Sequence, residues 1–457
     1  MEHKNVWKSY QADRLAEMEA FAKDYMSFIS SGKTERECAR LAVQAAETAG
    51  FKDLEQYETL TVGDKVYVNH MGKSFMAFVI GEEPLENGMN ILGAHIDSPR
   101  IDVKSNPLYE DSDLAYLDTH YYGGIKKYQW VTLPLALHGV LIKKNGEKIT
   151  LDIGEHEGDP VFCISDLLPH LAREQMQKTG GKLIDGEDMD LIVGSRPQAD
   201  EEKEAVRACV LSLLKEQYGI EEEDFLSAEL EIVPAGKARD MGFDRSMILA
   251  YGQDDRICAY PSMRAILDFK EVPKRTLCCI LTDKEEIGSV GATGVGSRYF
   301  EYTVAELLNK AGEYSELKRM RMLRNSFMLS SDVAVGFDPL YSSVFEKKNA
   351  AYLGGGICFT KFTGSGGKGF GSDANPEFIA KLLAVLDDHN VIYQFEEIGR
   401  VDAGGGGTIA EHLAKYCMNV LDAGVPVLSM HSPFEVASKA DLYETYRCYC
   451  AFLKGLQ

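Results

Sequence analysis

The sequence predicts an α/β fold in which a mainly parallel sheet, covered by helices, is interrupted by an inserted and mostly β domain. Two observations support this: strands alternate with helices after about residue 245, and the stretch before that point has a different, strand-rich character. At 457 residues the chain is also too long for one ordinary core. We therefore expect a first domain built from 1–105 and 246–457 and an inserted domain at 106–245.

The first 50 residues have the spacing of helices. "SYQADRLAEMEAFAKDYMSFIS" places Leu15, Met18, Phe21, Met26 and Phe28 on one stripe. "TERECARLAVQAAETAG" begins with a threonine cap that is followed three positions later by glutamate, and it ends at a glycine. Short apolar runs then follow, "KVYVNH", "SFMAFVI" and "MNILGAH", which predict strands.

The middle of the chain reads as a separate unit. It contains the strand-like run "VTLPLALHGVLIK", a predicted helical piece "ISDLLPHLAREQMQK" and a charge-rich segment "ADEEKEAVRACVLSLLKEQYGIEEEDF". Its two ends, "KSNPLYEDSD" and "VPAGKARDMGF", carry the proline, glycine and charge that are typical of domain boundaries.

Composition excludes several classes of protein. The content of 45% hydrophobic and 26% charged residues is that of a globular chain, and no run approaches 18 apolar residues, so a membrane span is not expected. The polar N-terminus lacks the pattern of a signal peptide, and the ten scattered cysteines form no CxxC pair, so we expect a cytoplasmic protein with reduced thiols. The net charge of -22 repels a phosphate backbone, which disfavours nucleic acid as a partner.

Metal-compatible side chains follow several apolar runs, at the point where each predicted strand ends. They are His95 and Asp97 after "NILGA", Glu285 and Glu286 after "RTLCCILT", Asp332 after "SFMLSS", His431 after "VPVLSM", and Asp254 with Asp255 between a strand and a helix in "MILAYGQDDRICAY". The carboxyl ends of strands in an open α/β sheet converge on the ligand crevice. Two histidines and several carboxylates are enough for two divalent ions, with Zn²⁺ favoured and Co²⁺ or Mn²⁺ also compatible.

Each residue also has an ordinary structural interpretation. A lone histidine after a strand is more often a hydrogen-bonded structural residue, an aspartate before a helix is often only a cap, and "DKEE" could be a solvated turn. Taken singly these interpretations are the better ones. The repeated coincidence at strand ends is what favours a metal site.

The adjacent glutamates can take different tasks if two ions are present. Successive residues leaving a strand point to different sides, so Glu286 can bind metal while Glu285 stands over a water bridged between the ions. An unligated carboxylate in that place can act as general base and then as general acid toward the leaving amine. Asp97 lies two residues from His95 and could orient the imidazole through its second nitrogen.

Eight stretches of this chain together resemble the aspartyl aminopeptidases, a family of two-metal zinc aminopeptidases. They are "AHIDSPRIDVK", "YYGGIKKYQW", "LLPHLA", "YGQDDRICA", "DKEEIGSVGATG", "LSSDVAVGFDPLY", "GGGGTIAEHL" and "LSMHSPFEV". The resemblance covers the chain from about Val62 to Asp441.

The resemblance implies a zinc-type exopeptidase that acts on peptides. It implies that His95 and Asp332 hold one ion and that Glu286 and His431 hold the other, with Asp254 bridging both, Glu285 as base and Asp97 beside His95. It also implies that the inserted domain mediates dimerisation, that dimers assemble into a dodecamer, and that His170 reaches the active site of a neighbouring subunit.

The sequence departs from the eukaryotic members of that family around the substrate pocket. Val335 and Asp338 stand where those members carry two histidines, "QDD" replaces "LDN", and "FEKKNA" replaces a "KHE" segment. The metal set is intact, but a preference for an acidic N-terminal residue is left undecided. Lys361 matches a family lysine near the substrate pocket and could pair with an acidic side chain; an exposed strand lysine is the ordinary alternative.

Other motifs fail. "GSGGKGFGSD" lacks the first glycine and the final Ser or Thr of a phosphate loop, "GVGSRY" has Tyr299 where a dinucleotide fingerprint needs glycine, and helical HExxH is absent. Two alternatives remain open. One is another two-metal amidohydrolase, such as a deacylase or a carboxypeptidase; the other is a non-catalytic metal-binding assembly protein, against which Glu285 argues.

Overall fold

A computed structural model describes residues 4–369 and 371–456. The chain forms two compact units. Unit 1 consists of Met1–Asp97, Ala238–Met430 and Glu435–Gln457, and unit 2 consists of Ser98–Lys237 and His431–Phe434. The insertion thus occupies 98–237 rather than the expected 106–245. The first boundary differs from the expected one because "KSNPLYEDSD" lies largely inside one long strand, Arg100–Asp111, and is not a linker.

Unit 1 is built around a nine-stranded sheet with the order β1-β2-β3-β13-β4-β14-β20-β16-β18. The central strands β13, β4, β14 and β20 run parallel, whereas β3 and β16 join this block in antiparallel fashion. The sheet is therefore mixed, with the predicted parallel strands at its centre. The strands are β1 (Lys52–Asp53), β2 (Lys65–His70), β3 (Ser74–Val79), β4 (Met89–His95), β13 (Thr276–Thr282), β14 (Phe327–Ser330), β16 (Ile357–Thr360), β18 (Tyr393–Glu396) and β20 (Asn419–Gly424).

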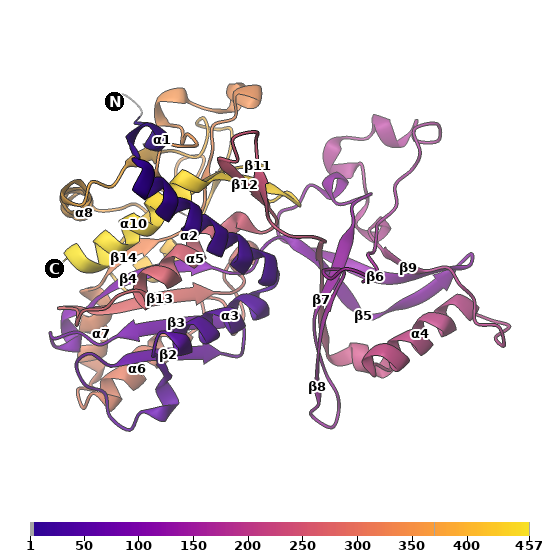
Figure 1. The fold of residues 1–457 in the computed structure, drawn as a ribbon, viewed down its shortest axis with the longest axis horizontal. Coiled ribbons are helices and arrows are strands. Elements are labelled where there is room, and N and C mark those ends of the chain that lie inside the picture. Colours follow the sequence, from indigo (N-terminus) through magenta and orange to yellow (C-terminus); the bar gives the residue numbers. More distant parts are fainter. Residues whose placement is uncertain (1–3, 370, 457) are drawn as a thin grey trace. The chain divides into compact units, whose positions relative to one another are not determined.

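Helices cover both faces of this sheet, and each face has its own apolar core (Figure 1). One core receives side chains from α2 (Ala12–Ser31), α3 (Glu35–Thr48), α5 (Gln253–Leu267), α8 (Pro376–Asp388) and α10 (Lys439–Gly455). The other receives side chains from α6 (Tyr299–Lys310), α7 (Glu316–Arg324) and α9 (Ala410–Ala414). A short helix, α1 (Val6–Ser9), precedes them. Strands buried on both faces explain why "RTLCCIL" and "NILGA" are almost wholly apolar.

The helix start predicted at Thr34 is confirmed. The Thr34 side chain accepts from the Glu37 amide, and the Glu37 side chain accepts from the Thr34 amide, so both orphan donors are satisfied. The helix ends before Gly50, whose φ of 86° suits the left-handed region that glycine tolerates.

A smaller five-stranded sheet in unit 1 has the order β11-β12-β22-β21-β15. Its strands are β11 (Arg239–Met241), β12 (Met247–Ala250), β15 (Ala334–Val335), β21 (Pro426–Leu428) and β22 (Glu435–Ser438). The run "VPVLSM" therefore contains β21 of this smaller sheet. The strand that precedes it in the chain, β20, is the one that lies in the large sheet. Because β21 follows β20 directly, the two sheets meet along this part of the chain.

Unit 2 is a six-stranded antiparallel sheet with the order β8-β7-β10-β5-β6-β9, against which α4 packs. Its elements are β5 (Arg100–Asp111), β6 (Leu114–Tyr122), β7 (Leu135–Ile142), β8 (Lys148–Ile153), β9 (Leu191–Gly194), α4 (Ala205–Tyr218) and β10 (Ala228–Pro234). The mostly β character predicted for the insertion is confirmed.

One predicted helix in unit 2 is wrong. "ISDLLPHLAREQMQK" forms turns and only a short 3-10 segment, Gln175–Gln177. Pro169 disfavours a helical conformation of the residue before it, and Leu167, Leu168 and Leu171 are all exposed, so no packed face holds a helix in place.

Of the helices in the described parts of the chain, not one combines the length and the apolar character that crossing a bilayer requires. The ten cysteines all lie in the described residues, and none of them forms a disulfide there.

Candidate metal centre

The centre lies where two parallel strands of the large sheet end together. Gly93 of β4 pairs with Ser330 of β14. His95 lies two residues beyond the first and Asp332 two residues beyond the second, so the chain delivers both side chains to the same rim of the sheet. Asp254 reaches the same place from the first turn of α5.

The side chains of these three residues converge. Nε2 of His95 lies 3.2 Å from Oδ1 of Asp254 and 3.9 Å from Oδ1 of Asp332. The ligand atoms of all three residues lie within 4.8 Å of one another. Two ligands of a tetrahedral zinc ion, each about 2.1 Å from the metal, are roughly 3.4 Å apart. The observed spacing therefore matches what one Zn²⁺ needs, and the donor set of one imidazole and two carboxylates is of the right type.

Asp97 holds the histidine in the orientation that a ligand requires. Nδ1 of His95 donates to the backbone carbonyl of Asp97 at 3.0 Å and lies 3.3 Å from its carboxylate. An imidazole that donates from Nδ1 carries its lone pair on Nε2, the nitrogen that faces Asp254 and Asp332.

Asp97 has a second task that the sequence did not reveal. Its carboxylate accepts the backbone N–H groups of Glu285 at 3.1 Å and Glu286 at 3.2 Å. The two glutamates form a 3-10 turn, Glu285–Ile287, entered through Lys284 with a φ of 67°. One buried aspartate thus fixes the imidazole and both glutamates relative to each other.

The two glutamates are not equivalent. Glu286 and Asp254 offer carboxylate oxygens within 4.8 Å of each other, as two ligands of one ion would. Glu285 is not part of either metal-compatible group that includes Asp254, although its Oε2 lies 3.9 Å from Nε2 of His95. This arrangement is compatible with Glu286 as ligand and Glu285 as an adjacent base.

Charge is concentrated at this rim. Burial opposes the charged form of His95, but hydrogen bonds with Asp254 and Asp97 and the charge of Glu285 raise its pKa well above the ordinary value. For Asp332, burial is the main cause, followed by the charges of Asp255 and Asp254, and together they raise its pKa well above the ordinary value. Several carboxylates in a buried place need protons or a cation to offset their charge, and the geometry suits a cation.

His431 belongs to the short segment His431–Phe434 of unit 2. Its Nδ1 donates to the carbonyl of Gly124 at 3.0 Å, which again leaves the lone pair on Nε2. A side chain at Gly124 would come within 3.3 Å of this ring, so glycine allows the close approach. The role of His431 as a ligand stays a prediction.

The two residues predicted to bind substrate lie in different surroundings. His170 is exposed and lines a cavity of about 970 Å³ within unit 2. Lys361 follows Thr360 at the end of β16, which runs antiparallel to β20. Its strand therefore ends toward the opposite edge of the sheet, and three strand spacings alone separate it from His95 by roughly 15 Å. Both substrate-binding roles stay predictions. For Lys361, the strand register within one chain does not place the side chain near His95.

Sequence reasoning missed Glu435, which opens β22 and is 1% exposed. Its Oε2 accepts the backbone N–H of Asp254 at 3.0 Å. The signal that could have found it is the one that drew attention to Glu285, an acidic residue beside an apolar strand, here in "PFEVA".

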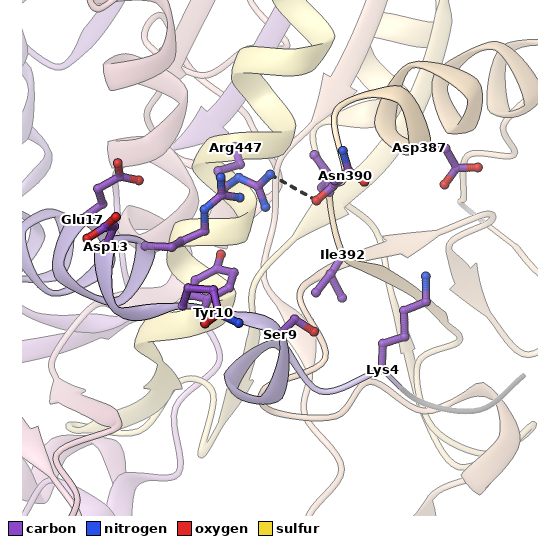
Figure 2. Close-up of a pocket in the computed structure, with 12 residues that line it drawn as sticks. Lys4, Ser9, Tyr10, Asp13, Glu17, Asp387, Asn390, Ile392 and Arg447 are labelled. Carbon is purple, nitrogen blue, oxygen red and sulfur yellow. Dashed lines mark hydrogen bonds between the residues drawn. The ribbon is translucent and has the colours of Figure 1, made fainter.

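A cavity of unit 1, of about 600 Å³, has a different character from the metal centre (Figure 2). It lies beside Tyr10 and Arg447, and Arg447 donates to the carbonyl of Asn390 at 3.1 Å. Tyr10 and Arg447 both donate to the buried carboxylate of Glu444. The described residues that line this cavity include neither histidine nor cysteine.

Comparison with known proteins agrees with this geometry. Residues 28–453 match the family model described as aminopeptidase I zinc metalloprotease (M18). A protein of Clostridium acetobutylicum named "Probable M18 family aminopeptidase 1" is 56% identical over 459 residues, covering 99% of this chain and 98% of its own length. The crystal structure of an M18 family aminopeptidase from Thermotoga maritima superposes with a TM-score of 0.96 at 45% identity, with 100% of both chains covered. The mApe1 dodecamer of S. cerevisiae is similar in fold alone, with a TM-score of 0.76 at 20% identity over 94% of this chain and 95% of that one.

Proposed function

Because the chain belongs to the aminopeptidase I zinc metalloprotease (M18) family, we propose that it removes N-terminal residues from peptides with two divalent ions held at the rim of its large sheet. The chain is a metallo-aminopeptidase, a hydrolase of peptide bonds, by that membership. The two-ion centre, the identity of the base and the substrate preference are the parts that we propose. The convergence of His95, Asp254 and Asp332 is the observation that supports the metal centre.

The first ion fits the residues present. His95 and Asp332 would hold it together with Asp254, whose ligand atoms have the spacing that zinc requires. Neighbouring carboxylates raise the pKa of His95, and burial together with nearby acids raises the pKa of Asp332, so negative charge that a divalent ion would offset is concentrated here. Zinc is the metal that the family description names, and Co²⁺ or Mn²⁺ accept the same donors.

The second ion would be held by Glu286 and His431, with Asp254 shared between the two ions. Glu286 and Asp254 already lie at ligand spacing. The segment that carries His431 is short, because β21 ends at Leu428 and β22 begins at Glu435, and both strands belong to unit 1. The Nδ1 hydrogen bond of His431 leaves the tautomer in which Nε2 can bind a metal.

Catalysis then divides between the ions and Glu285. When bound, two divalent ions supply the Lewis acidity that polarises a peptide carbonyl and acidifies water. Glu285 takes a proton from the attacking water and delivers it to the amine that leaves. Asp97 keeps Glu285 in place through the hydrogen bond to its backbone amide, so the base does not depend on a flexible turn.

Substrate choice and assembly are the remaining parts of the proposal. An acidic N-terminal residue is one candidate preference, although Val335 and Asp338 stand where the eukaryotic members of the family carry two histidines. We propose that the chain acts in the cytoplasm and forms dimers that assemble into a dodecamer, the state in which mApe1 of S. cerevisiae is found. The exposed His170 would then be available to a neighbouring subunit.

A substrate and metal panel tests the proposal. The enzyme is stripped with a chelator, reloaded with Zn²⁺, Co²⁺ or Mn²⁺ separately, and assayed on amino-acid anilides with acidic, basic and apolar first residues. Each anilide is paired with its N-acetylated form. We expect activity to return with metal and only on free amines; faster cleavage of N-acetylated substrates would instead identify a deacylase, and a need for a free C-terminal carboxylate would identify a carboxypeptidase.

A further inference from the structure

Glu435 is a buried carboxylate that contacts the metal centre without being one of its donors. It opens β22, is 1% exposed, and its Oε2 accepts the backbone N–H of Asp254 at 3.0 Å. The acceptor lies in a place with little water, where a hydrogen bond is stronger than at the surface and an unpaired backbone N–H would be costly. It acts on the backbone of the residue that the proposed function shares between two ions.

The first residue of β22 also holds Gln253, the residue before Asp254. Nε2 of Gln253 donates to the backbone carbonyl of Glu435 at 2.7 Å and to that of Ile248 at 3.2 Å. Ile248 lies in β12, whose Ala250 pairs directly with Glu435. The turn that carries Asp254 is therefore tied to two adjacent strands of the small sheet by three hydrogen bonds.

These contacts do not affect the two ion sites equally. His95 and Asp332 are placed by β4 and β14 of the large sheet, independently of β22. Asp254 is placed through Glu435, and His431 lies only four residues before Glu435 in the chain. A displacement at Glu435 would therefore move two of the three donors of the second ion but only one of the three donors of the first.

We propose that Glu435 is a positioning residue that sets the affinity of the second ion site through its hydrogen bond to the Asp254 amide. The inference rests on the two-ion centre proposed above. The length of the side chain matters more than its charge, because the task of the carboxylate is to reach one backbone N–H.

Two variants separate length from charge. Glu435→Gln keeps the length and an acceptor oxygen but removes the charge, whereas Glu435→Asp keeps the charge but shortens the side chain by one methylene. Zinc titrations in chelator-buffered solutions, followed by calorimetry and by the visible spectrum of the Co²⁺ form, report both sites without an activity assay. We expect E435Q to bind the second ion within about threefold of the wild-type affinity and E435D to bind it roughly 10 to 100 times more weakly, with the first site unchanged.

Asp441 provides the matched control. It is another fully buried carboxylate of unit 1, and it accepts the backbone N–H groups of Gly354 and Gly356, both at 2.7 Å. Asp441→Glu also changes a buried carboxylate by one methylene, but the backbone groups it binds are those of Gly354 and Gly356 and not that of Asp254. It should lower thermal stability and leave both ion affinities as they are. At saturating metal, E435D should recover most of the wild-type kcat, which a general loss of structure would not permit.

The outcomes are distinct. If wild type binds two ions and E435D binds the second ion with unchanged affinity, this inference alone is overturned. It is also overturned if E435Q loses as much affinity for the second ion as E435D does, or more. Equal weakening of both sites, or the same weakening in D441E, would also contradict it. One ion in the wild-type chain would overturn the proposed two-ion centre and this inference with it. Should E435D fail to fold, E435Q decides: loss of its second ion rejects the proposal, and retention supports it.

Discussion

The large sheet of unit 1 carries two groups of buried carboxylates that satisfy their charge in different ways. The rim group joins Asp254 and Asp332 to the imidazole of His95 at the end of β4. The inner group consists of Glu396 and Asp422, which flank Thr360 on adjacent strands.

Hydroxyl groups surround the inner carboxylates. Thr360 donates to Glu396 at 2.8 Å, and Thr408 donates to Asp422 at 2.5 Å. Burial raises the pKa of Glu396 to about 7 and that of Asp422 to about 6. The comparison shows that buried acids alone do not indicate a metal site: acids beside hydroxyls in mid-sheet take up protons, whereas acids that meet an imidazole at the strand ends can share a cation.

Removing one carboxylate from each group gives the largest expected contrast. Asp332→Ala should lose the first ion and reduce turnover by about 10³-fold or more, because several kcal/mol of Lewis-acid stabilisation is lost. Asp422→Asn should keep the full metal content. Elemental analysis and kcat of both variants check this, and equal metal loss in the two would remove the distinction between the groups.

Gly424 offers a smaller, steric change at the rim. A Cβ built there would lie 1.7 Å from the backbone carbonyl of Asp332, so an alanine must push this ligand away from its place. A displacement of about 1 Å near reacting groups can cost on the order of 10²-fold in rate. Gly424→Ala should therefore bind metal more weakly and turn over more slowly, whereas Gly367→Ala, with no atom within 4 Å of the added Cβ, should behave as wild type.

The inner group should be detectable in the pH dependence of stability. The folded pKa of Glu396, about 7, lies above its ordinary value of 4.5, so its contribution is complete below about pH 4.5 and is lost as the pH rises through 7. Glu396→Gln cannot ionise and should be more stable than wild type at pH 8 by on the order of 1 to 3 kcal/mol. Urea unfolding of the metal-loaded protein at pH 5 and 8 measures this, with the less buried Glu397→Gln as control. A wild-type and an E396Q profile of the same shape would contradict the assignment.

Much of the rim could be predicted from the sequence because it follows from strand topology. Parallel strands end at one edge, so His95 and Asp332, each just past an apolar run, had to approach each other once β4 and β14 became neighbours. The same argument was of no help for Lys361, because a sequence does not show that β16 runs against β20.

Contacts made through the backbone were also beyond prediction. The Asp97 carboxylate holds the amides of Glu285 and Glu286, and Glu435 holds the amide of Asp254. Such contacts depend on where a loop brings its N–H groups, and backbone groups carry no residue-specific signal. The helix expected around Pro169 failed for a related reason, since no neighbouring surface of unit 2 covers its leucines.

The most direct test of the central claim is the metal content and the turnover of Glu285→Gln, measured on the same sample. The account predicts two ions per chain, as in wild type, with a kcat lower by roughly 10²-fold or more, the scale of general acid–base catalysis. An E285Q protein that has lost an ion would make Glu285 a ligand. One that keeps both ions and wild-type turnover would show that another group moves the proton.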